Sequence, residues 1–235
     1  MDIQDRFMAK RRRKKNKIYN IVVIAVFLIL AVLGSYLIPK PNITLDDIPD
    51  YDGEPYVEIN QNEPYFEDID WDQAPYEYYS DLDYLGRAQY AEAYIDESLF
   101  PTEKRGSIGM IKPSGWQTAR YDGIVEGNYL YNRCHLIGYQ LTAENANEKN
   151  LITGTRYLNV TGMLPWENEV HDYIEETGNP VLYRVTPVYE GRNLVASGVL
   201  MEAESEDSEV KFCVYCYNVQ PGIVIDYLDG SSYQE

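Results

Sequence analysis

The stretch NYLYNRCHLIGY, residues 128–139, contains the pattern on which the fold and chemistry of this chain depend. Residues 128–134 are rich in aromatic side chains that alternate with polar ones, which predicts a β-strand that ends at His135. The chain has only two histidines, and a neutral imidazole is the side chain best suited to accept a proton near pH 7. Arg133 lies two residues earlier and therefore on the same side of the strand. This stretch predicts a strand that delivers a general base with an arginine beside it.

Three side chains with oxygen atoms follow at short spacings: Asn150, Asn159 and Glu167. Pro165 is expected to begin a helix that Gly178 ends, because proline suits the first helical turn and glycine the position after the last. Oxygen ligands that carry little charge suit Mg²⁺, which keeps most of its waters. A base, a hard cation held by few protein ligands and nearby arginines are together suited to the hydrolysis of a phosphodiester.

The tetrapeptide Asn132-Arg133-Cys134-His135, with Asn150, Asn159 and Glu167 behind it, resembles the active-site pattern of the DNA/RNA non-specific endonucleases, which are ββα-metal (His-Me finger) nucleases. That family carries an Asp-Arg-Gly-His motif, then an asparagine, a metal-binding asparagine nine residues later, and a glutamate. The resemblance covers residues 57–230 and is most specific at residues 131–139, 150–159 and 218–222. Within the family, the chain resembles the membrane-anchored nucleases of DNA uptake.

The resemblance implies a role for each matching residue. His135 would be the general base that activates water, and Asn159 would be the one direct protein ligand of Mg²⁺, for which Mn²⁺ is expected to substitute. Glu167 would hold metal-bound waters. Asn150 and Arg133 would orient the site and support the charge of the transition state.

The chain departs from the family pattern at three positions. Asn132 replaces the usual aspartate and removes a carboxylate. Cys134 replaces a glycine, so a positive φ at this position would be strained. His171 lies where some members of the family place an arginine, which leaves the phosphate contact expected there without its usual residue.

The charge distribution limits where a polyanion can bind. The net charge is −18 at pH 7, and residues 41–85 carry fourteen Asp/Glu and no Lys/Arg. Beyond the basic N-terminal flank, basic side chains outnumber acidic ones in residues 101–156, seven to five. Contact with DNA, and also with RNA, must therefore depend on this basic segment, where Lys112, Arg120 and Arg156 are the expected substrate-binding residues.

The coarse pattern predicts an α+β domain with a mainly antiparallel sheet and a ββα-metal finger. Helical spacing predicts a helix over residues 85–100, and residues 150–155 predict a second short strand. Further strands are expected at residues 181–189, 194–203 and 211–219, with a hairpin turn at residues 190–193. The acidic residues 57–85 contain too many aromatic side chains for a linker and are expected to wrap onto the domain as extended edge structure.

The N-terminal residues predict a membrane anchor. Eight Lys/Arg precede residues 18–38, which contain no ionisable Asp, Glu, Lys, Arg or His, and 21 helical residues cover the roughly 30 Å hydrocarbon core of a bilayer. The positive-inside rule makes residues 1–17 a cytoplasmic tail and residues 18–38 a transmembrane helix. Residues 39–56 would be an acidic stalk and residues 57–235 an extracellular domain. The alternative is a cleaved secretory signal, but residues 34–36 are a poor cleavage site.

Three cysteines, Cys134, Cys213 and Cys216, lie in the part expected outside the cell, where disulfides persist. The simplest arrangement is one disulfide between Cys134 and one of the other two. The alternative is a zinc site in which Cys213 and Cys216 supply one half and Cys134 and His135 the other, although Cys213 and Cys216 should point to opposite faces of a strand.

These observations lead to one main functional hypothesis: a surface-anchored, Mg²⁺-dependent endonuclease that cleaves DNA, and also RNA, without sequence specificity. One alternative is a catalytically silent component that binds or takes up nucleic acid. Another is a structural adhesin whose acidic, tyrosine-rich segment is its interaction surface.

Overall fold

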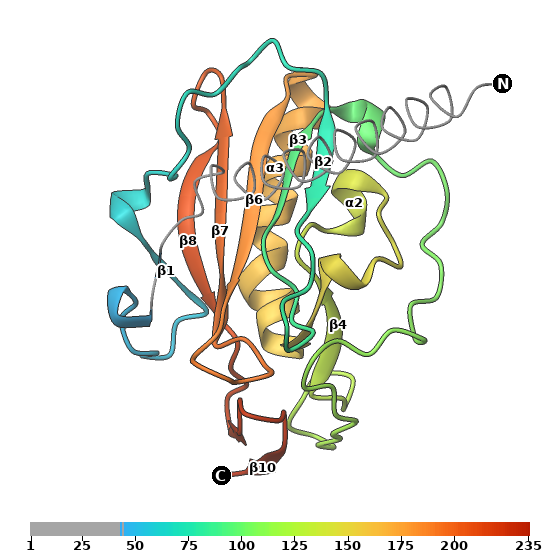
Figure 1. Cartoon of the computed structure of the whole chain (residues 1–235), viewed down its shortest axis with the longest axis vertical. Coiled ribbons are helices and arrows are strands. Elements are labelled where there is room, and N and C mark those ends of the chain that lie inside the picture. Colours follow the sequence, from blue (N-terminus) through green and yellow to red (C-terminus); the bar gives the residue numbers. More distant parts are fainter. Residues whose placement is uncertain (1–42, 44) are drawn as a thin grey trace, which may run out of the picture. The chain divides into compact units, whose positions relative to one another are not determined.

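A computed structural model describes residue 43 and residues 45–235, and the compact unit that it shows is Ile43–Glu235. Its centre is a six-stranded sheet with the order β1-β8-β7-β6-β3-β2, in which every neighbouring pair is antiparallel (Figure 1). The strands of this sheet are β1 (Tyr56–Glu58), β2 (Tyr76–Tyr79), β3 (Ala91–Ile95), β6 (Val181–Val188), β7 (Gly198–Ser205) and β8 (Lys211–Tyr217). The predicted antiparallel α+β architecture is confirmed for the described residues.

The alternation of side chains along the strands places a core cluster on each face of the six-stranded sheet. On β8, Phe212, Val214 and Cys216 belong to the first cluster, which is the larger. The neighbouring residues Cys213 and Tyr215 belong to the second cluster. Cys213 and Cys216 therefore point to opposite faces, as the spacing predicts.

Helix α3 (Leu164–Thr177) covers the face of the sheet that carries the first cluster (Figure 1). Val170 and Ile174 are fully buried in that cluster. Pro165 lies in the first turn, and Gly178 ends the helix with φ 71° while its N–H donates to the Ile174 carbonyl at 2.8 Å. The end of the helix is as predicted, because its signal depends on backbone conformation alone. At the other end, α3 continues directly from a π-helix at Leu158–Met163, so Pro165 lies in the first turn of α3 without beginning the helical segment.

The acidic segment supplies both edge strands of the sheet, β1 beside β8 and β2 beside β3, as expected. The middle of the acidic segment is held against the sheet by a buried ion pair between Arg184 and Glu202. The Arg184 guanidinium donates two hydrogen bonds of 2.9 Å to Glu202, whose carboxylate also accepts from the N–H of Tyr65 at 2.8 Å. The Phe66 ring lies over the Arg184 guanidinium at 4.7 Å. The acidic segment is therefore part of the folded domain.

The compact unit also includes residues that were predicted to form a solvated stalk. Ile43, Leu45 and Ile48 pack against the second cluster, and the Tyr217 hydroxyl donates to the Pro49 carbonyl at 2.8 Å. The predicted boundary between residues 56 and 57 thus falls inside the folded unit. Within the described part of the chain, no helix has the length and apolar character that a membrane span requires. The predicted tail and span, residues 1–38, lie outside the described residues.

The helix predicted over residues 85–100 is wrong. This stretch forms β3, followed by a 3₁₀ turn at Glu97–Leu99. Ala91, Ala93 and Ile95 are all fully buried in the first cluster, at the period of two that a strand requires. Pairing with β2 on one side and β6 on the other overrides the helix propensity of the alanines.

The strand predicted from residue 194 begins four residues later, at Gly198. The expected turn is present, since Asn193 N–H donates to the Glu190 carbonyl at 2.9 Å. The delay arises because Leu194 and Val195 donate their N–H groups to the carbonyls of Leu228 and Tyr227 in the C-terminal segment.

Two small sheets complete the fold: β4 (Tyr131–His135) with β5 (Leu151–Thr155), and β9 (Ile223–Ile225) with β10 (Ser232–Gln234). Neither is joined to the six-stranded sheet by a strand ladder. Asn218, fully buried just after β8, makes the connection to the β4–β5 pair. Its Oδ1 accepts from the Thr155 N–H at 2.8 Å, and its Nδ2 donates to the carbonyls of Thr153 at 3.1 Å and Ala196 at 2.9 Å.

Replacement of Asn218 by alanine should lower the free energy of unfolding by about 3 kcal/mol or more, because it leaves one buried N–H and two carbonyls without that partner and each costs about 1–3 kcal/mol. Urea denaturation monitored by circular dichroism measures the change. Asn168→Ala is the control. It removes one exposed hydrogen bond on α3, so the change should stay within about 0.5 kcal/mol. Equal losses in the two variants would contradict the role of Asn218.

Candidate functional site

Strands β4 and β5, a π-helix at Leu158–Met163 and α3 follow one another around a single cavity. His135, at the end of β4, pairs with Leu151 at the start of β5. The π-helix carries Asn159 and α3 carries Glu167. The cavity has a volume of about 240 Å³ and is lined by Arg105, His135, Gly138, Tyr139, Gln140, Asn159, Leu164 and Glu167. The expected ββα arrangement is therefore present, and it brings three of the predicted site residues together.

The hydrogen bonds of His135 define its tautomer. The Arg105 guanidinium, which can only donate, lies 3.0 Å from Nδ1, and the Asn145 carbonyl, which can only accept, lies 2.8 Å from Nε2. The proton is therefore on Nε2 and the lone pair on Nδ1. Burial lowers the pKa of His135 to about 4, so the imidazole is neutral at pH 7. A neutral ring with its lone pair on Nδ1 is the form that a general base requires, and in this structure Arg105 donates to that lone pair.

Arg105 is the residue that sequence reasoning missed. It was counted only as a member of the basic segment, yet it contacts the base and lines the cavity. It comes from a loop without regular secondary structure, and no local pattern predicts that such a loop folds back onto His135, 30 residues away. The local excess of basic side chains was the one signal in the sequence.

Glu167 presents a buried carboxylate to the cavity. Burial raises its pKa to about 7, and the Arg105 charge and the Gly138 N–H oppose that rise. A Cβ at Gly138 would lie 2.8 Å from a Glu167 carboxylate oxygen, so only glycine permits this close approach of the backbone.

Asn159 lines the cavity from the π-helix, a form that occurs mostly as short insertions and often at functional sites. Its Oδ1 lies 3.1 Å from Sγ of Cys134. Amide and carboxylate oxygens are the ligands of a hard divalent cation, and a cation next to Glu167 would favour its ionised form. The donor set of Asn159 and Glu167 therefore fits Mg²⁺.

Asn150 is fully buried but does not line the cavity. Its Oδ1 accepts from the Ile137 N–H at 2.9 Å, and its Nδ2 donates to the Ile137 carbonyl at 3.0 Å. Both ends of the amide are thus used to hold the backbone between His135 and Gly138. This geometry agrees with the expectation that Asn150 orients the site. The expectation that it supports the charge of the transition state has no such contact behind it, because the amide does not line the cavity.

A second cavity of about 500 Å³ adjoins the first, because Arg105 and Asn159 line both. Its other lining residues are Ile108, Trp116, Thr118, Tyr129, Tyr131, Asn132, Arg133 and Arg156. The Arg133 guanidinium lies 4.0 Å from the centre of the Trp116 ring and donates to the carbonyls of Gly109 and Ile111. We refer to the two cavities together as the groove.

The three predicted substrate-binding residues do not all reach the groove. Arg156 lines it, with an ion pair to Glu126 at 3.5 Å. Lys112 is exposed and does not line either cavity. Arg120 is also exposed, outside the lining, and pairs with Asp122 at 2.6 Å.

The expected disulfide is wrong, since all three cysteines are free and buried. Cys134 and Cys216 belong to the first cluster and Cys213 to the second, on the other face of the sheet, so the three thiols do not converge on one zinc ion.

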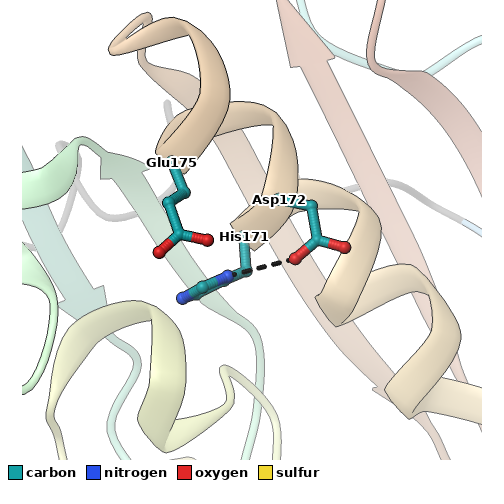
Figure 2. A group of neighbouring side chains, drawn as sticks. All are labelled: His171, Asp172 and Glu175. Atoms are coloured by element: carbon teal, nitrogen blue, oxygen red, sulfur yellow. Dashed lines mark hydrogen bonds and ion pairs between the residues drawn. The ribbon is translucent and has the colours of Figure 1, made fainter.

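A separate group of metal-binding side chains lies farther along α3. The ligand atoms of His171, Asp172 and Glu175 all lie within 4.8 Å of one another. Figure 2 shows the His171 ring nitrogen facing the Asp172 carboxylate, at 3.3 Å. The His171 ring stacks on Phe100 at 4.7 Å and lines neither cavity of the groove.

Comparison with known proteins now identifies the family. The family model described as DNA/RNA non-specific endonuclease matches residues 68–207. The chain belongs to the DNA/RNA non-specific endonuclease family. The matched residues include the whole β4–β5–α3 unit and therefore every residue that lines the first cavity.

Solved structures share the fold of this family member. NucA from Streptococcus agalactiae, with a magnesium ion bound, superimposes with a TM-score of 0.69 at 24% identity, over 76% of this chain and 87% of that one. The Sda1 nuclease with a bound zinc ion gives a TM-score of 0.60 at 29% identity, over 68% of this chain and 81% of that one. A deoxyribonuclease of Streptococcus dysgalactiae subsp. equisimilis is 34% identical over 110 residues. That match covers 44% of this chain and only a third of the length of the curated relative.

The buried state of His135 makes stability depend on pH in a defined direction. Its pKa in the fold, about 4, lies below the ordinary 6.5. The unfolded chain binds a proton at this residue more readily than the folded chain does. The contribution of neutral His135 to the free energy of unfolding is therefore complete above pH 6.5 and is lost as the pH falls through 6.5 towards 4. Between pH 7 and pH 4, wild type should lose roughly 3 kcal/mol more unfolding free energy than His135→Asn, which cannot take up a proton there. Urea denaturation across this range tests the difference, and parallel curves for the two proteins would contradict it.

Proposed function

We propose that this chain is a metal-dependent endonuclease that hydrolyses phosphodiester bonds of DNA, and also of RNA, without sequence specificity. The observation that carries the proposal is the cavity in which a buried, neutral His135 with its lone pair on Nδ1 lies beside Asn159 and Glu167. The family supports the reaction class, and the deoxyribonuclease relative supports DNA as a substrate.

Three side chains at and behind the first cavity then have defined tasks: His135, Arg105 and Asn150. Nδ1 of His135 accepts a proton from the attacking water, and the Asn145 carbonyl holds the opposite ring nitrogen. Arg105 occupies Nδ1 in the structure, so the guanidinium must move onto the phosphate as the water takes its place. There it would stabilise the negative charge that develops on the phosphate oxygens. Asn150 keeps the loop that follows His135 in position.

Asn159 and Glu167 would hold the metal, Asn159 through its amide oxygen and Glu167 through bound waters. When bound, Mg²⁺ supplies Lewis-acid stabilisation of charge on the phosphate and the leaving oxygen. Mn²⁺ should substitute, because it also accepts oxygen ligands. NucA was solved with magnesium and Sda1 with zinc, which agrees with a divalent-cation site in this fold.

The groove accounts for substrate binding without sequence reading. Arg105, Arg133 and Arg156 place positive charge along it, and such charges bind the phosphate backbone of any sequence. Arg133 is already bonded to loop carbonyls and stacked on Trp116. Its main contribution is a fixed positive wall beside the reacting phosphate.

Digestion of plasmid DNA and of RNA by the full chain, with Mg²⁺ and with EDTA, tests the proposed activity. His135→Ala should lose about 10²–10⁴ in rate because the base is gone. Asn159→Ala should lose Mg²⁺-dependent cleavage, while Asn159→Asp keeps part of it. His171→Ala is the control and should cleave like wild type, because His171 is outside the groove. Wild-type protein that binds both substrates and cleaves neither would instead establish a silent binding component.

The same variants allow the groove to be tested by binding alone. On an inactive His135→Ala background, Arg156→Ala should flatten the plot of log affinity against log salt by about 0.9 on duplex DNA, the value for one phosphate contact. Arg120→Ala should leave the slope unchanged, since this arginine is also ion-paired but lies outside the groove. Equal slopes for the two variants would contradict the proposed path.

We further propose that residues 18–38 anchor the protein in the cell membrane, with residues 1–17 in the cytoplasm and the nuclease domain outside. The support is the uncharged apolar stretch behind a basic flank. Protease added to intact cells should remove the domain and leave the N-terminal tail protected. A domain that survives this treatment, or a mature chain that begins near residue 36, would overturn the topology.

A further inference from the structure

Cys134 occupies the position where the family motif has glycine, and its surroundings show how the chain accommodates it. The residue is only 1% exposed and is packed in the first core cluster. It does not adopt a positive φ, so its side chain causes no backbone strain. On the neighbouring strand, a Cβ at Gly154 would lie 2.6 Å from the Cβ of Cys134. The space that the thiol needs is therefore provided by a glycine on β5.

The thiol points at the residue proposed to hold the metal. Sγ of Cys134 lies 3.1 Å from Oδ1 of Asn159. Within the described residues, no other hydrogen bond to the Asn159 side chain is present. A thiol carries one hydrogen, which it can donate to this oxygen.

This contact favours one of the two orientations of the Asn159 amide, the one in which Oδ1 lies beside the thiol. A thiol donates its hydrogen to the amide oxygen, whereas a reversed amide would direct its N–H groups at a sulfur that is only a weak acceptor. A carbonyl oxygen has two lone pairs, so Oδ1 can accept the thiol hydrogen and still face a cation with the other. A reversed amide would present its NH₂ group to the cation and repel it.

We propose that Cys134 is a positioning residue that holds the Asn159 amide with its oxygen available to the catalytic cation. The inference rests on the proposed function, because it takes Asn159 as the metal ligand. It predicts that this chain, with cysteine in the motif, depends on a side-chain hydrogen bond that a glycine at that position cannot make.

The chain supplies a matched control in Cys216. This thiol is also fully buried in the first cluster, and each of the two cysteines lies 3.5 Å from a methionine sulfur, Met163 for Cys134 and Met201 for Cys216. Replacement of either by alanine removes the same atom from the same core. Only Cys134 contacts Asn159.

The first test is Mn²⁺ binding to the full chain without nucleic acid, measured from the electron paramagnetic resonance signal of free Mn²⁺. Cys134→Ala should weaken binding about five- to tenfold, as expected for one hydrogen bond. Cys134→Ser should stay within about threefold of wild type, because its hydroxyl donates to the same oxygen. Cys216→Ala should bind like wild type. Cys134→Gly, which also lacks the donor, replaces Cys134→Ala if that variant does not fold.

Cleavage assays give the second readout. The Mg²⁺ concentration for half-maximal rate should rise in Cys134→Ala by the same factor, while the rate at saturating Mg²⁺ stays within about twofold. Equal weakening in Cys134→Ala and Cys216→Ala, or in the alanine and serine variants, would overturn the inference and leave the nuclease proposal standing. Wild-type protein that binds no Mn²⁺ would overturn both. Protein that binds Mn²⁺ without cleaving would overturn the nuclease activity alone.

Discussion

The active-site unit depends on hydrogen bonds from one buried amide. Strands β4 and β5 form a sheet of their own, so no ladder fixes them to the six-stranded sheet. Asn218 replaces that ladder with bonds to Thr155, Thr153 and Ala196. A second buried amide, Asn150, then holds the loop after His135 in the same way. Both asparagines bond to backbone groups through both ends of the side-chain amide, and the geometry of the site depends on them.

Burial is what gives the site its chemistry. The same loss of solvation lowers the pKa of His135 to about 4 and raises that of Glu167 to about 7, because each group is held closer to its neutral form. For the histidine, this produces a base that is ready at neutral pH. For the glutamate, it leaves a carboxylate whose ionised form a cation or Arg105 must stabilise. The overall charge of −18 therefore does not decide the local electrostatics of the groove.

The departure from the family motif at Cys134 is compensated on the neighbouring strand. The side chain of Cys134 on β4 fits because Gly154, close to it on β5, has no side chain. A close-packed core accepts a larger side chain only where a neighbour leaves room for it. The thiol then lies next to Asn159. Asn132, by contrast, lines the second cavity and not the first.

The sequence by itself determined the features that depend on neighbouring residues. These are the strand that ends at His135, the helix between Pro165 and Gly178, and the spacing that brings Asn159 and Glu167 to one cavity. Such features follow from backbone preferences and short loops, which a local pattern contains.

Only the tertiary structure decided the features that depend on distant contacts. It made residues 91–95 a strand, because β2 and β6 pair with them on either side. It placed Arg105 on His135, left the cysteines unpaired and kept Arg120 outside the groove. In each case the deciding contact joins segments far apart in the chain or depends on packing in three dimensions, and no local periodicity records it.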